Sequence, residues 1–115
     1  MFSLPKHREF GTPITEWVEM IPNELEADAV GLWQLVPCFS ADFGLSGREL
    51  EKYLHLAIEA LIKRGAVPVE APDTGLVRQD LLSNGVPDVE KVMQYLASLG
   101  REPTVNDVWF ELVGG

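Results

Sequence analysis

Few side chains in this sequence have the type and spacing needed for chemistry. The chain contains two histidines, His7 and His55, and one cysteine, Cys38. No His-x-x-x-His or Cys-x-x-Cys pair occurs, and a metal site needs several convergent ligands. Cys38, between Pro37 and Phe39, is more typical of a small buried hydrophobe than of a nucleophile. We therefore predict no catalytic residue, no metal ligand and no cofactor.

Carboxylates are the one chemical group in excess. Asp and Glu number 18 against 9 Lys and Arg, which gives a formal net charge of −9. Two close carboxyl groups can act as a general acid and a general base, so a small enzyme with a carboxylate pair is one candidate. Abundance alone does not identify such a pair, and we rank this function third.

The acidic residues are concentrated in the first half of the chain. From Glu9 to Gly47 the sequence has seven acids and no Lys or Arg. Nucleic acids and anionic membranes are bound through clustered basic residues, so both are disfavoured as partners. A one-sided charge instead favours a basic protein partner. The alternative is that these acids form only a solvated face.

Trp17 adds an aromatic ring to this acidic stretch. It lies between Glu16 and Glu19 and is expected to be partly exposed, whereas Trp33 and Trp109 are expected in the core. An aromatic ring beside carboxylates suits an interface with a basic surface. The predicted partner-binding residues are Glu16, Trp17, Glu19, Glu24, Glu26 and Asp28.

The elements that must position these residues are clearest in the second half. Ser46 to Glu49 matches a capping box, apolar residues then recur at helical spacing, and Gly65 follows as a C-cap, which predicts a helix over 46–64. Asp88 and Gly100 delimit a second helix in the same way. The β-branched segment 66–70 and the aromatic segment 108–113 are predicted to pair as strands, with Pro68 at a sheet edge.

The first half is less regular. Thr12 or Thr15 is expected to cap a short helix that runs through Met20. Residues 23–26 resemble a capping box, which favours a helix over 24–36 limited by Pro37; a strand over 30–36 is the alternative. Residues 71–87 are expected to form a long connection with one turn around 75–82.

Together these segments predict one globular domain over residues 1–115. Its class is α+β, mainly α, with three to four helices and a small two- or three-stranded antiparallel sheet, in an arrangement that could be winged-helix-like. No apolar run approaches the roughly 20 residues of a membrane span, and the N-terminus lacks the apolar core of a signal peptide. With one cysteine, a reducing, cytoplasmic location is expected.

Three segments resemble small bacterial proteins that look like immunity proteins of polymorphic-toxin or contact-dependent-inhibition systems. They are LWQL, ALIKRGAVPVE and YLASLGREPTVNDVWFEL, within residues 28–112. The resemblance implies a non-enzymatic protein that binds and neutralises a cognate toxin, for which a nuclease is a natural choice. It carries over no functional residue. The alternative is a winged-helix-like regulatory or adaptor domain, whose basic face would have to come from Arg48, Lys52, Lys63 and Arg64.

Overall fold

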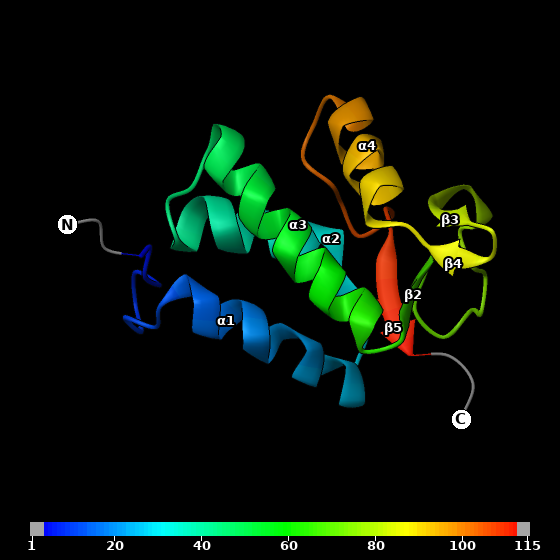
Figure 1. The fold of residues 1–115 in the computed structure, drawn as a ribbon, viewed down its shortest axis with the longest axis horizontal. Coiled ribbons are helices and arrows are strands. Elements are labelled where there is room, and N and C mark those ends of the chain that lie inside the picture. Colours follow the sequence, from blue (N-terminus) through cyan, green and yellow to red (C-terminus); the bar gives the residue numbers. More distant parts are fainter. Residues whose placement is uncertain (1–3, 113–115) are drawn as a thin grey trace.

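Helix α3 is the central element of the fold, with α1 and α4 packed on different sides of it (Figure 1). The structure is a computed structural model and describes residues 4–112. A three-stranded antiparallel sheet, in the order β1-β5-β2, lies beside the helices. The predicted α+β, mainly α, class is confirmed. The α-helices are α1 (Ile14–Met20), α2 (Leu32–Pro37), α3 (Gly47–Lys63) and α4 (Val89–Leu99), and the strands of the sheet are β1 (Val30–Gly31), β2 (Ala66–Val69) and β5 (Trp109–Leu112).

The predicted central helix is confirmed, but its expected capping box is wrong. The buried face of α3 is formed by the apolar residues at helical spacing, and Gly65 follows the helix with a φ of +105°. Ser46 occupies the N-cap position, yet its side chain makes no capping hydrogen bond. We attribute this to Gly47, whose φ of +57° departs from the right-handed path between Ser46 and Glu49 that a capping box requires.

Helix α4 and the strand pair β2–β5 agree with the sequence. The Asp88 side chain accepts a hydrogen bond from the Glu90 N–H, and Gly100 ends α4 in the left-handed conformation. Strands β2 and β5 pair antiparallel, with Pro68 opposite Phe110. Strand β2 is an edge strand of this sheet, so the expected edge position of Pro68 is confirmed.

The helix predicted over 24–36 is wrong. The chain forms a short 3-10 helix, η1 (Ile21–Glu26), then strand β1, and only then α2. Gly31 is extended because Val30 and Gly31 pair with Phe110 and Trp109 of β5. The Gly31 N–H instead donates to Oε1 of Gln34 at 2.8 Å. The strand alternative therefore holds for the first two of its residues.

The α-helix ends at Pro37, as predicted, but the helical path continues beyond it. Pro37 is the last residue of α2, and the chain continues directly into one π-helical segment, η2 (Cys38–Asp42). Its φ of −63° is compatible with a helix. The Cys38 N–H donates to the carbonyls of Gln34 and Leu35, so the turn closes around the proline.

The connection over 71–87 contains more structure than predicted. After the 3-10 turn η3 (Gln79–Leu81), strands β3 (Leu82–Ser83) and β4 (Val86–Pro87) form a hairpin. Asn84 and Gly85 form its two-residue loop with φ values of +53° and +79°. Two-residue hairpin loops with positive φ favour Asn-Gly. The sequence therefore contained a hairpin signal, which the prediction of one turn around 75–82 did not use.

Trp33 and Trp109 are half-buried, so the prediction that both lie in the core is wrong. Their rings pack edge to face with centroids 6.0 Å apart. Trp109 also donates its indole N–H to the Val105 carbonyl at 2.9 Å. The largest fully buried side chains are instead Phe39 and Phe110. Among residues 4–112, no helix has the length and apolar character needed to cross a membrane.

Candidate functional site

The predicted partner-binding residues lie on and just beyond α1 and η1, which follow each other directly. The short helix expected through Met20 is confirmed, but Pro13, rather than Thr12 or Thr15, is its N-cap. Ile14, Ile21 and Leu25 are buried and hold α1 and η1 against α3. The polar positions between them therefore face solvent.

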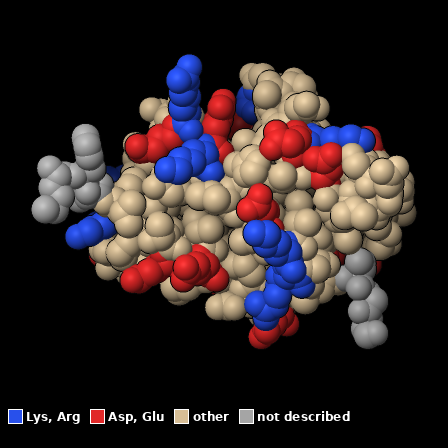
Figure 2. Space-filling view, in the orientation of Figure 1, with Lys and Arg blue, Asp and Glu red and all other residues tan. Residues whose placement is uncertain are grey.

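We define the acidic face as the five predicted carboxylates of this region. All five are exposed: Glu16, Glu19, Glu24, Glu26 and Asp28. Among the residues that the structure describes, Glu26 alone of these forms an ion pair, with Arg64 after the end of α3. Figure 2 shows acidic side chains over α1 and, beside them, basic side chains at the end of α3. Four of the five carboxylates thus remain without a cationic partner within residues 4–112.

Trp17 is half-buried, as predicted, and belongs to an aromatic cluster. Its indole stacks on the imidazole of His7, which in turn contacts Phe10 with ring centroids 4.7 Å apart. Phe43 packs edge to face with Trp17, with ring centroids 5.6 Å apart. Phe10 is 68% exposed, so this cluster presents apolar surface next to the acidic face.

His7 is only 6% exposed, although it lies seven residues into the sequence. Its Nδ1 accepts hydrogen bonds from the N–H groups of Glu9 and Phe10, at 3.1 and 3.4 Å. Because Nδ1 accepts, the ring proton is assigned to Nε2, which lies 3.5 Å from Oδ2 of Asp42. The imidazole therefore fixes the segment before α1 and holds Trp17 in place.

A hollow of about 390 Å³ opens beside Trp17, between α1, η1 and α2. Trp17, Met20 and Leu35 give it apolar walls, and Glu24 and Asp28 also line it. Met20 is 55% exposed. The structure thus brings Trp17, Glu24 and Asp28 together at one hollow, whereas Glu16, Glu19 and Glu26 do not line it. Met20 was not among the predicted residues, since its exposure follows from the packing of α1.

Cys38 also lines this hollow, but its thiol is not activated. Burial, followed by the negative charge of Asp42, raises the pKa of Cys38 to about 11. The thiol is therefore protonated at neutral pH and is a poor nucleophile. Cys38 packs against the core, as predicted for a hydrophobic side chain, but it is half-buried rather than buried.

Ionisable groups elsewhere form structural pairs. Asp107 is buried and accepts from Arg101, from the Tyr95 hydroxyl at 2.7 Å and from the Thr104 N–H. The bond from Arg101 is the largest cause that holds the pKa of Asp107 far below its usual range. His55 Nε2 lies 2.8 Å from Glu90 on the surface between α3 and α4. Within residues 4–112, no group of three or more His, Cys, Asp or Glu side chains is arranged to hold a metal ion.

Comparisons of this chain with protein families, with curated proteins and with solved structures find no match. The geometry described above is therefore the basis for the functional argument.

Proposed function

We propose that this protein is a non-enzymatic binding protein whose acidic face and adjoining hollow dock a basic protein. The observation that carries the proposal is the hollow itself. There Trp17 and Met20 form apolar walls beside the carboxylates of Glu24 and Asp28, in a stretch without Lys or Arg. The chemistry suits an Arg or Lys side chain of a partner.

Each part of the hollow has a role in this binding. The aliphatic stem of a partner's Arg or Lys packs on Met20, and the cationic head is attracted both by the Trp17 ring and by the two carboxylates. The remaining acids of the face, Glu16 and Glu19, act at longer range. Unpaired surface charges of one sign accelerate encounter with an oppositely charged protein and orient it.

A cognate toxin is the partner class that the resemblance to immunity proteins suggests. A nuclease needs a basic surface to bind phosphate groups. An acidic protein that occupies that surface would exclude the substrate. Inhibition by occupancy requires no catalytic group, which suits a chain whose lone thiol is protonated and whose histidines are held in structural contacts.

The two other candidate functions receive less support from the described residues. DNA binding through α3 would need free cations, but two of the four candidates are paired: Lys63 lies 3.5 Å from Glu59, and Arg64 pairs with Glu26. An acid/base carboxylate pair needs one carboxyl group with a raised pKa. Each described carboxyl group with a shifted pKa has it lowered: Asp80, Asp88 and Asp107.

The test is capture of the partner by the immobilised full-length protein, first from the product of the gene immediately upstream. E24K/D28K is expected to slow association by about tenfold or more at low salt and little at high salt. E49K/E70K changes the net charge equally at exposed positions that do not line the hollow and is expected to keep most of the association rate. M20A is expected to speed dissociation. If E24K/D28K and E49K/E70K behave alike, the acidic face is only a solvated surface and the proposal is wrong.

A further inference from the structure

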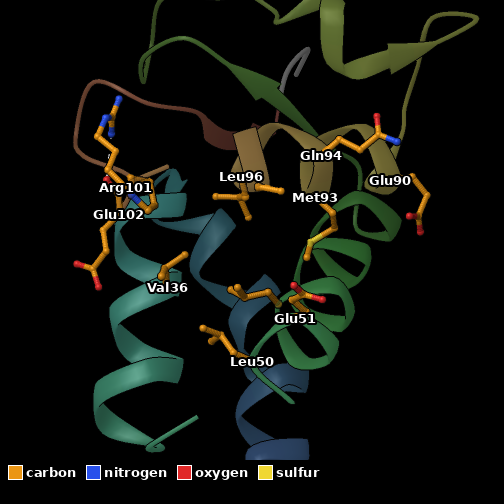
Figure 3. A pocket seen from close by; sticks show the side chains of 12 residues that line it. Val36, Leu50, Glu51, Glu90, Met93, Gln94, Leu96, Arg101 and Glu102 are labelled. Carbon is orange, nitrogen blue, oxygen red and sulfur yellow. Dashed lines mark hydrogen bonds between the residues drawn. The ribbon is translucent and has the colours of Figure 1, made fainter. Parts of the chain in front are cut away.

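A second hollow of about 400 Å³ lies between α3 and α4 and shares no lining residue with the first. Figure 3 shows Leu50 and Val36 on one side of this cavity and Met93 and Leu96 on the other. Leu54 of α3 also lines it. We name this hollow the α3–α4 groove. Its volume lies in the range of roughly 300–1,000 Å³ typical of ligand sites, enough for a few side chains.

The apolar lining of the groove is incompletely covered. Leu50, Met93 and Leu96 pack against the core but remain half-buried, so part of each side chain faces the open groove. Burying apolar surface is favourable by about 25 cal/mol per Å². The groove is therefore suited to apolar side chains supplied from outside.

The rim of the groove is acidic. Glu51 of α3 and Glu90 of α4 lie on one side of the cavity, and Glu102, after α4, lies on the other (Figure 3). Arg101 is the one Lys or Arg in the lining, and its Nη1 is bound at 2.9 Å to Oδ2 of the buried Asp107. Arg48, Lys52 and His55 line an adjoining hollow, which shares Glu51, Glu90 and Met93 with the groove. His55 pairs there with Glu90, which leaves Glu51 and Glu102 as the free rim charges within residues 4–112.

We propose that the α3–α4 groove binds an apolar helical segment of a partner protein that carries Lys or Arg on both sides of its apolar residues. Charge complementarity selects this occupant, because the carboxylates at opposite sides of the groove match cations that flank an apolar centre. A neutral apolar molecule would leave these carboxylates without a cationic partner, and an anionic lipid would be repelled by them. Two packed helices that present an apolar groove are a recurrent platform for an amphipathic helix.

The probe is a labelled synthetic helical peptide with Leu at positions i, i+4 and i+7 and Lys at both ends, with a matched peptide in which Glu replaces each Lys. Fluorescence anisotropy with the full-length protein measures both affinities. The Lys peptide is expected to bind about tenfold tighter than the Glu peptide at low salt. M93S is expected to lower the affinity for the Lys peptide by about tenfold, because it removes an apolar wall of the groove.

The decisive variant is E51K/E102K, which changes two exposed side chains that make no side-chain hydrogen bond among the described residues. It is expected to abolish or reverse the preference for the Lys peptide. The matched control E9K/E70K has the same net charge, changes two exposed residues outside both hollows and is expected to retain the preference. Circular dichroism checks that each variant is folded. Equal binding of both peptides to the wild type, an unchanged preference in E51K/E102K, or binding of an apolar dye that neither peptide displaces would each overturn the proposal.

Discussion

The indole of Trp17 lies flat on the imidazole of His7, with ring centroids 4.6 Å apart and planes inclined by 25°. The same imidazole accepts two backbone N–H groups through Nδ1. One buried ring therefore organises both the segment before α1 and the aromatic wall of the candidate binding site. Changes at His7 should affect stability and the position of Trp17 together.

The variant H7A tests this organisation. It removes the stack with Trp17 and the acceptor for the Glu9 N–H, and we expect it to lower the free energy of unfolding by about 2 kcal/mol. Urea unfolding monitored by tryptophan fluorescence measures the loss. H55A is the matched control, because His55 takes part in a solvent-exposed pair worth less than about 1 kcal/mol. An equal effect of the two variants would contradict the role given to His7.

Gly31 is predicted to tolerate no side chain. A Cβ placed there would lie 2.6 Å from Cδ1 of Trp33 and 3.1 Å from Cε3 of Trp109. We expect G31A to destabilise the fold by about 1–3 kcal/mol through this overlap. The double variant G31A/W33A should lose less than the sum of the two single variants, since the smaller side chain removes the clash. Strictly additive losses of unfolding free energy, measured by urea unfolding, would contradict a clash between a Cβ at position 31 and Trp33.

Asp107 is predicted to make stability depend on pH in acid. Its pKa in the folded protein is lowered, chiefly by Arg101, so the stability that its charge contributes is complete above the unfolded pKa of about 3.9. That contribution is lost as the pH falls below this value towards the folded pKa. The difference in unfolding free energy between wild type and D107N should therefore be constant near neutral pH and shrink below about pH 4. A difference that stays constant down to pH 2.5, in urea titrations, would show that this ionisation does not stabilise the fold.

Cys38 is predicted to react slowly with thiol reagents in the native protein. Its pKa is raised from 9.0 to about 11, so the thiolate fraction at pH 8 is about a hundredfold lower than that of an unperturbed cysteine. The ratio of the alkylation rate by iodoacetamide in buffer to the rate in denaturing urea measures how far folding suppresses the reactivity of the thiol. Native and denatured rates within a factor of about three would contradict the burial of the thiol.

The helices α3 and α4 could be predicted from sequence because their periodicity and their glycine C-caps are local. Strand β1 could not, because Val30 and Gly31 are extended by pairing with Phe110 and Trp109, about eighty residues later in the chain. Such long-range pairing overrides the local signal that favoured a helix over 24–36. The hairpin around Asn84 differs, since its Asn-Gly signal was present in the sequence.

The candidate site was predictable in its chemistry and not in its shape. The excess of carboxylates and the position of Trp17 between Glu16 and Glu19 are visible in the sequence. The hollow arises where α1, η1 and α2 meet, and this depends on the break at Gly31 that the sequence interpretation missed. Only Trp17, Glu24 and Asp28 of the predicted set therefore line it.

Pro68 has a consequence for how any partner can attach. It removes one amide donor from β2, and the outer side of that strand is already joined to residues 76–78, since Arg78 donates to the Pro68 carbonyl and Glu70 to Leu76. At the opposite edge, β1 has two residues and the Gly31 N–H is taken by Gln34. The sheet thus offers little template for an added strand or for edge-to-edge aggregation. Addition of a partner strand to this sheet is therefore disfavoured, and both proposed binding sites use side chains instead.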